Sequence, residues 1–216
     1  ATPDGYTLIA GSPLELILTP LGISAAKNKA EDVRMIAVAG RSDLMLAVRK
    51  DFAASTPEQF LAALKADAKG LSYGSTGIGS LYHIMGAKMI QTAGAKGLHV
   101  PFNGLAPVLQ ALGGGQIDFA FLPVAGPVPG YVDAGNVKAV SVASAQNSPR
   151  FPALPLMKNI KGFEDFSFSI WAGIQTSAKV PNDIAAALHK SAYTALANPE
   201  LKKQLRSEEH TSELQS

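Results

Sequence analysis

The sequence predicts an α/β fold, in which helices cover a sheet of parallel strands. Short apolar segments rich in strand-forming residues alternate with segments of helical hydrophobic spacing, and clusters of glycine, proline and hydroxyl residues separate them. Such alternation is typical of strands joined by crossover helices. The chain has 216 residues, of which 47% are hydrophobic and 17% charged, enough for one large or two small domains.

The first part of the chain predicts three strands. Strand-forming residues occupy Tyr6–Ala10, and Gly11-Ser12 ends this segment. Val33–Val38, apolar apart from Arg34, and the continuous apolar run Leu44–Val48 are expected to be buried strands.

The clearest helix signal begins at Thr56. Thr56 can cap the helix, Pro57 suits its first turn, and Gln59 takes the place of a capping-box partner. Apolar residues then recur at helical spacing to Ala68, and Gly70 is placed to end the helix.

Strands and helices continue to alternate after this helix. The expected strands are Leu71–Tyr73, His99–Phe102, Ile117–Leu122, Val137–Ala143 and Phe166–Ile174. The expected helices begin at Leu81, cover Leu105–Leu112, form a short broken turn after Leu122, and cover Pro181–Ala197.

Composition excludes several classes of function. Cysteine is absent, so disulfides, thiolate nucleophiles and cysteine-bound metals are excluded. No apolar run approaches the about 18 residues of a membrane span. The 19 basic and 17 acidic residues form no basic block, which argues against nucleic-acid and membrane-surface partners. The histidines form no i, i+4 pair and lie beside no acidic cluster, so no metal is expected.

The segment "YGSTGIGSLYH" at Tyr73–His83 joins an expected strand to an expected helix, where backbone N–H groups can gather around an anion. It lacks the lysine of a nucleotide-binding P-loop and the third glycine of a dinucleotide fingerprint, so neither cofactor is expected. Its remaining donors are neutral: the hydroxyls of Ser75, Thr76 and Ser80, and the backbone around Gly79. The loop alone leaves ligand binding and a purely structural turn open.

A hydrolase reading is an alternative for the same loop. Ser75 does not stand in a G-x-S-x-G elbow. Ser75 or Ser80 could still meet His83 or His99 in space, because triads are defined by geometry. Both histidines can equally be structural.

Five motifs occur in a fixed order along the chain: "PDGYTL" at Pro3–Leu8, "YGSTGIGSLYH", "HVPFNG" at His99–Gly104, "GGQID" at Gly114–Asp118, and "W-G" at Trp171–Gly173. In this order and spacing the chain, from residue 1 to about Leu205, resembles the Bug-type (tripartite tricarboxylate transporter) periplasmic solute-binding proteins. Phe102-Asn103 departs from the tyrosine-lysine pair more usual in that family.

The resemblance implies a two-lobed type II periplasmic-binding-protein fold that closes on its ligand by a hinge motion. Lobe 1 would comprise residues 1–45 and 165–205, and lobe 2 residues 46–164. The family's first βαβ unit precedes the "PDGYT" motif, so we expect lobe 1 to lack it. Residues 206–216 match an in-frame translation of a common sequencing adapter, and we expect them to be a non-native tail.

The resemblance, with the rule that ligands bind at the carboxyl ends of parallel strands, predicts the binding residues. They are Gly11, Ser12, Ser75, Thr76, Gly79, Ser80, Phe102, Asn103, Gly104 and Pro123. Neutral donors, partly through water, would hold the carboxylates without an arginine clamp. Phe102 would be an apolar wall or a core residue, whereas Pro13, Asp118 and Trp171 are expected to be structural.

The expected function is capture of a small carboxylate: a di- or tricarboxylate, an acidic amino acid or an aromatic acid. The protein would be a periplasmic monomer without catalytic residues or cofactor, and would deliver its ligand to the membrane subunits of a tripartite tricarboxylate-type transporter. Two alternatives stay open: an α/β hydrolase that uses Ser75 or Ser80, and a ligand sensor for a signalling partner.

Overall fold

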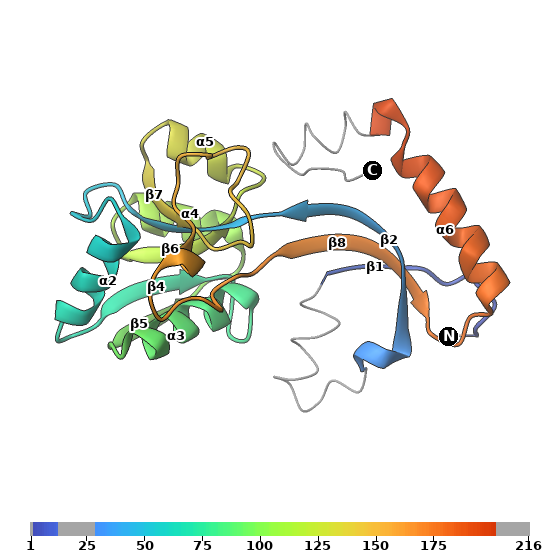
Figure 1. Ribbon diagram of the computed structural model, residues 1–216, viewed down its shortest axis with the longest axis horizontal. Coiled ribbons are helices and arrows are strands. Elements are labelled where there is room, and N and C mark those ends of the chain that lie inside the picture. Colours follow the sequence, from blue (N-terminus) through green and yellow to red (C-terminus); the bar gives the residue numbers. More distant parts are fainter. Residues whose placement is uncertain (1, 13–28, 202–216) are drawn as a thin grey trace. The chain divides into compact units, whose positions relative to one another are not determined.

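The computed structural model describes residues 2–12 and 29–201 (Figure 1). The chain forms two compact units: unit 1 comprises Ala1–Ser42 and Ile170–Ser216, and unit 2 comprises Asp43–Ser169. No helix in the described ranges is long and apolar enough to cross a membrane. Pro13 and residues 206–216, for which the sequence also made predictions, lie outside the described residues.

Unit 2 is built on a five-stranded sheet in the order β5-β4-β6-β3-β7. Its strands are β3 (Leu44–Arg49), β4 (Leu71–Ser75), β5 (Gly97–Pro101), β6 (Phe119–Pro123) and β7 (Val137–Val142). The sequence predicted all five, with ends that differ by at most two residues. β3 and β6 are almost entirely buried, which is why they read as unbroken apolar runs.

Strand direction in unit 2 departs from the predicted all-parallel sheet. β4 runs parallel to β5 and β6, but β3 runs antiparallel to both β6 and β7. A strand parallel to β6 would need a crossover connection that returns the chain to the edge where β6 begins. Only Asp43 separates β3 from the strand before it, so there is no such connection. β3 therefore starts beside the end of β6, where Leu44 pairs with Pro123 and the Val124 N–H donates to the Asp43 carbonyl over 2.8 Å.

Helices cover both faces of this sheet (Figure 1). Unit 2, all of which is described, contains α2 (Pro57–Ala66), α3 (Leu81–Ala93), α4 (Leu105–Gly113), α5 (Val128–Asp133) and the 3-10 helix η3 (Met157–Asn159). On one face, Leu112 of α4 and Val128 of α5 pack against Met45 and Leu122. On the other face, the α2 ring of Phe60 meets Phe119 edge-on, with 5.1 Å between centroids.

The start of α2 follows the sequence signal closely. Thr56 Oγ1 accepts from the Gln59 N–H over 3.3 Å, and Gln59 Oε1 accepts from the Ser55 N–H over 2.8 Å, so the predicted capping pair is present. The helix ends two residues before the predicted Ala68. The reason is that the Asp67 carboxylate accepts the N–H groups of Lys69 and Gly70 and turns the chain.

Unit 1 contains a three-stranded antiparallel sheet in the order β1-β8-β2. Its elements are β1 (Ile9–Gly11), the 3-10 helix η2 (Ala30–Asp32), β2 (Val33–Ser42), β8 (Ile170–Ser177) and α6 (Asn182–Leu196). The parallel prediction is wrong here too. Ile170 pairs with Ser42, so the chain returns beside the point at which it left and must run antiparallel.

Three unit 1 elements differ from their predicted positions. The strand predicted as Val33–Val38 continues to Ser42. The first strand is Ile9–Gly11 instead of Tyr6–Ala10, and the last strand begins at Ile170 instead of Phe166. Phe166 belongs to the core of unit 2, where its ring lies 5.5 Å from that of Phe121. The predicted helix Pro181–Ala197 is confirmed as α6, and His189 on it bonds through Nδ1 to the Ile36 carbonyl of β2 over 2.7 Å.

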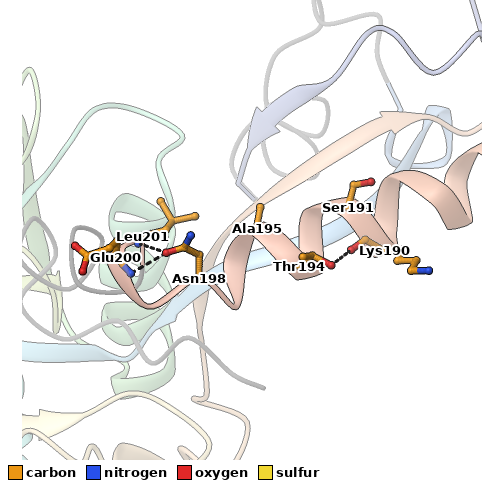
Figure 2. A pocket seen from close by; sticks show the side chains of 7 residues that line it. All are labelled: Lys190, Ser191, Thr194, Ala195, Asn198, Glu200 and Leu201. Atoms are coloured by element: carbon orange, nitrogen blue, oxygen red, sulfur yellow. Dashed lines mark hydrogen bonds between the residues drawn. The ribbon is translucent and has the colours of Figure 1, made fainter.

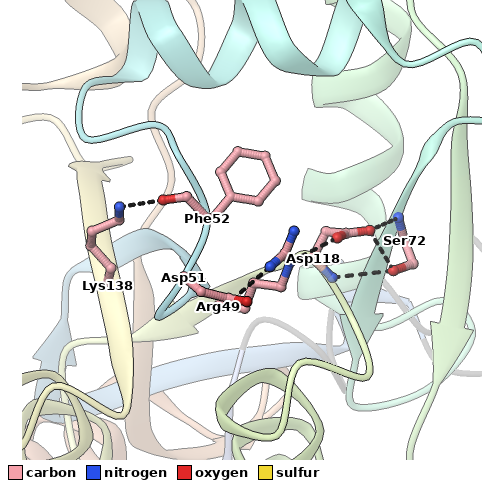
Figure 3. Close-up of polar contacts among 6 residues, drawn as sticks. All are labelled: Arg49, Asp51, Phe52, Ser72, Asp118 and Lys138. Atoms are coloured by element: carbon pink, nitrogen blue, oxygen red, sulfur yellow. Dashed lines mark hydrogen bonds and ion pairs between the residues drawn. The ribbon is translucent and has the colours of Figure 1, made fainter.

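Asp118 ties three strands of unit 2 together at the edge where β4 and β6 begin (Figure 3). Its Oδ2 accepts from both the N–H and the hydroxyl of Ser72 over 2.8 Å, and its Oδ1 accepts from Arg49 Nε over 3.1 Å. Arg49 also pairs with the exposed carboxylate of Asp51. Asp118 is therefore structural, as expected, because it satisfies backbone and side-chain donors of neighbouring strands.

We predict that Asp118→Ala lowers the free energy of unfolding by about 1 to 3 kcal/mol, because it leaves the partly buried N–H and hydroxyl of Ser72 without their acceptor. The matched control is Asp51→Ala, which removes only an exposed partner of Arg49 and should cost much less. Chemical denaturation of both variants measures the difference. Equal losses would contradict the role assigned to Asp118.

Gly86 lets α3 approach the sheet closely. A Cβ atom at Gly86 would lie 2.2 Å from Cε2 of the buried Tyr73 ring, whereas one at Gly130 of α5 would meet nothing within 4 Å. Both glycines are helical. Gly86 is therefore required by packing, and Gly130 is not.

We predict that Gly86→Ala destabilises the protein by about 1 to 3 kcal/mol through overpacking. Gly130→Ala should stabilise it by about 0.5 to 1 kcal/mol, from helix propensity alone. Thermal melts of the two variants test this pair. A stabilised Gly86→Ala protein would refute the close packing of α3 on Tyr73.

Candidate ligand-binding site

Three loops of unit 2 meet at one edge of its sheet. Because β4, β5 and β6 are parallel, their carboxyl ends lie at the same edge, and Ser75 at the end of β4 pairs with Pro101 at the end of β5. Loops 76–80, 102–104 and 124–127 leave from these ends. The structure thus brings together eight of the ten predicted residues: Ser75, Thr76, Gly79, Ser80, Phe102, Asn103, Gly104 and Pro123. Parallel sheets commonly bind ligands at this edge.

The hydroxyls of Ser75 and Ser80 are used inside the first loop. Ser75 is 1% exposed, and its Oγ lies 3.0 Å from the Gly77 carbonyl and 3.2 Å from the Gly77 N–H. Ser80 is the N-cap of α3, and its Oγ accepts from the His83 N–H over 3.2 Å. These two serines therefore shape the loop from within.

Free donors of the loop lie at its outer positions. The backbone N–H groups of Thr76 and Ile78 have no hydrogen-bond partner among the described residues. Thr76 is partly exposed, and Ile78 is 79% exposed. Gly77 and Gly79 have φ of 135° and 80°, values that other residues rarely adopt, so glycine is needed to present this arc of backbone.

The second loop, 102–104, is fixed to the first by a backbone hydrogen bond. The Phe102 N–H donates to the Ser75 carbonyl over 2.9 Å. The Phe102 ring packs against the hydrophobic core, whereas Asn103 is exposed. Gly104, with φ of 105°, is the N-cap of α4 and provides no side-chain cap. Asn103 is thus the side chain of this loop that is available to a ligand.

Pro123, at the third loop, is buried and pairs with Leu44 of β3. It lies beside the hydrogen bond from the Val124 N–H to the Asp43 carbonyl, at the point where the chain enters unit 2. The exit is at the same edge, since the Phe168 N–H donates to the Ala143 carbonyl just after β7. Pro123 positions this edge and offers no donor of its own.

Gly11 and Ser12, the other two predicted residues, belong to unit 1. Gly11 pairs with Gly173, and a Cβ at Gly11 would lie 3.5 Å from both polar atoms of the Gln175 amide. Gln175 is fully buried, and neither polar atom of its side chain has a hydrogen-bond partner within residues 2–12 and 29–201. Sequence reasoning missed Gln175, although a glutamine at an inward position of an apolar strand is a usable signal, since a buried polar group needs a partner.

Two histidines support the first loop from neighbouring elements. His99 Nε2 lies 2.7 Å from Ser75 Oγ, and His83 Nδ1 accepts from the Gly79 N–H over 3.0 Å. The two rings stack with centroids 3.9 Å apart. Burial, and next the charge of His83, lower the pKa of His99. Sequence reasoning treated both histidines only as structural residues or as a possible base.

The contact between Ser75 and His99 does not form a catalytic triad. Ser75 is buried, and no carboxylate among the described residues bonds to His99. Within the same part of the chain, no group of three His, Asp or Glu side chains is arranged to hold a metal.

A separate hollow of about 730 Å³ lies along the C-terminal half of α6 in unit 1 (Figure 2). Its lining residues are Lys190, Ser191, Thr194, Ala195, Asn198, Glu200 and Leu201. The Thr194 hydroxyl donates to the Lys190 carbonyl. The side-chain oxygen of Asn198 accepts from the N–H groups of Glu200 and Leu201. These polar groups satisfy the end of the helix and do not converge on a ligand.

The chain is similar to transporter receptors along nearly its whole length. Residues 1–213 match the family model described as the tripartite tricarboxylate transporter family receptor. A UPF0065 protein of Bordetella pertussis is 25% identical over 199 residues, which make up 92% of this chain and 61% of that protein. The chain spans about 60% of the length of such curated relatives.

Solved structures show the same architecture. The periplasmic binding protein BugD is 26% identical, with a TM-score of 0.75, and the match covers 95% of this chain and 68% of BugD. MatC from Rhodopseudomonas palustris, solved with bound malate, is 24% identical, with a TM-score of 0.75, and the match covers 95% of this chain and 69% of MatC. At 24% identity, the similarity to MatC shows a shared fold alone.

These similarities overturn the hydrolase alternative, because the family consists of receptors of a transporter and not of enzymes. They confirm the predicted α/β periplasmic-binding fold and the periplasmic localisation. The chain belongs to the tripartite tricarboxylate transporter receptor family, whose members include the Bug-type periplasmic solute-binding proteins.

Proposed function

We propose that this protein captures a small carboxylate at the carboxyl edge of the unit 2 sheet and delivers it to the membrane subunits of a tripartite tricarboxylate-type transporter. The observation that carries the proposal is the meeting of three loops with neutral donors at the end of parallel strands. Both connections to unit 1 also leave from this edge. Hinge closure of the two units over the ligand would complete its enclosure.

Neutral donors would carry the recognition. Loops 76–80, 102–104 and 124–127 contain no charged residue. The free N–H groups of Thr76 and Ile78, the Thr76 hydroxyl and the Asn103 amide would bond to carboxylate oxygens, directly or through water. Ser75, Gly79, Ser80, Gly104 and Pro123 would hold these groups in place, and the exposed Ile78 would cover the apolar part of the ligand.

In unit 1 we propose that the side-chain amide of Gln175 bonds to the carboxylate, with Gly11 and Ser12 beside it. A fully buried amide without partners in the described part of the chain costs stability, and its presence favours a task in binding. Gly11 places no side chain against that amide, where even a Cβ atom would lie 3.5 Å from both polar atoms.

The ligand class follows from the family and from this chemistry. The family is described as receptors for tricarboxylate transport, and MatC, of the same fold, holds malate. We therefore propose a di- or tricarboxylate as ligand, with an acidic amino acid or an aromatic acid as the neighbouring possibilities, and a monomeric receptor.

We predict stoichiometric binding of a carboxylate without chemical change. Calorimetry with malate, citrate, glutamate and benzoate, together with analysis of the recovered acids, measures both properties. Thr76→Val should weaken binding about tenfold, the loss of one hydrogen bond to a charged group. The control is Thr194→Val on α6, whose hydroxyl bonds only within its helix. Product formation, or equal effects of the two variants, would contradict the proposal.

Gln175→Leu provides a second test, because it separates binding from stability. We expect weaker carboxylate binding together with an unchanged or higher melting temperature, since the buried amide has no partner to lose. Gln110→Leu on the exposed face of α4 is the control and should change neither quantity. A less stable Gln175→Leu protein with unaltered affinity would assign Gln175 to the fold alone.

A further inference from the structure

His83 and His99 form a stacked pair that holds the loop 75–80 at two points. His83 lies in the first turn of α3 and bonds to the Gly79 N–H, while His99 lies on β5 and bonds to the Ser75 hydroxyl. Their rings are 3.9 Å apart and inclined by only 20°. The loop conformation therefore depends on both rings, and through the acceptor Nδ1 of His83 it depends on the protonation of the pair.

The bond to Gly79 requires an uncharged His83. Its Nδ1 accepts a hydrogen bond over 3.0 Å, so that nitrogen carries no proton. A proton there would place one donor against another and break the bond. It would also put a positive charge in face-to-face contact with the second imidazole, so the pair resists a second proton.

No counter-charge offsets a proton on this pair. The Tyr73 ring of β4 lies 5.0 Å from His99 and 6.3 Å from His83, and burial raises the pKa of Tyr73. Burial also raises the pKa of Tyr82, the neighbour of His83 on α3, to about 12, so both phenols stay neutral. Among the described residues, no acidic or basic side chain forms a hydrogen bond or ion pair with either ring.

We propose that His83 and His99 are positioning residues of the carboxylate site, which hold the loop 75–80 in its binding shape while both rings are uncharged and release it when the pair takes up a proton. This inference rests on the proposed function, since it assigns that loop to the ligand. Carboxylate binding would then weaken in acid, although a positive charge alone would attract the anion.

The direction of the pH dependence follows from the lowered pKa of His99 in the folded protein. Burial, and then the charge of His83, hold the pKa of His99 below its ordinary value of 6.5. The ordered loop therefore binds fewer protons than the released loop, and it loses stability as the pH falls below about 6.5. For a single proton the loss reaches at most about tenfold per pH unit.

Nuclear magnetic resonance of the ligand-free chain tests the coupling directly. Between about pH 8 and pH 5, we expect the Gly79 amide resonance to shift in step with titration of the histidine rings. His83→Asn, whose amide oxygen can replace Nδ1 as acceptor, should abolish that shift. A Gly79 resonance that stays fixed while the rings titrate would overturn the proposal.

Malate affinity measured over the same range tests the consequence. The wild-type affinity should fall between pH 7 and pH 5.5, by at most about tenfold. The double variant His83→Asn/His99→Gln should lose the pH dependence, whatever its affinity at pH 7, and its profile also corrects for titration of malate itself. His189→Asn in unit 1 should retain the wild-type profile.

The possible outcomes separate the two proposals. A double variant with the wild-type slope, or stronger wild-type binding in acid, would overturn the role of the pair. Absence of binding of malate, citrate, glutamate and benzoate at every pH would contradict the proposed function, and the Gly79 titration would still decide whether the pair controls the loop.

Discussion

The parallel alignment of β4, β5 and β6 is the constraint on which the candidate site depends. It places the ends of three strands, and hence three loops, at one edge of the unit 2 sheet. The reversed strand β3 adds to this arrangement, because the chain enters at Asp43 beside the end of β6. A single edge of the unit 2 sheet thus collects the loop donors and both connections to unit 1.

The absence of charged residues from the three loops has a physical consequence. Fixed N–H groups and hydroxyls can stabilise a carboxylate without the desolvation cost of burying a lysine or arginine beside it. Such recognition works only if the donors are already in place, because a flexible loop would lose entropy on binding. The bonds of Ser75, Ser80 and the two histidines inside the first loop supply that order.

Local signals in the sequence were sufficient for most of the fold. The buried run at Leu44 and the cap at Thr56 predicted their elements because each depends on neighbouring residues alone. The reversed direction of β3 could not be predicted, since it depends on where the chain enters the sheet. Likewise, His99 and Ser75 are 24 residues apart, and only the pairing of β4 with β5 brings them into contact.

Mapping of malate onto nitrogen-15-labelled protein tests the central claim most directly, because backbone resonances respond even to weak binding. The account predicts that the amides of Thr76 and Ile78 and the side chain of Asn103 shift together and saturate with one affinity. Shifts confined to lysine- or arginine-bearing segments, with these three groups unchanged, would contradict it.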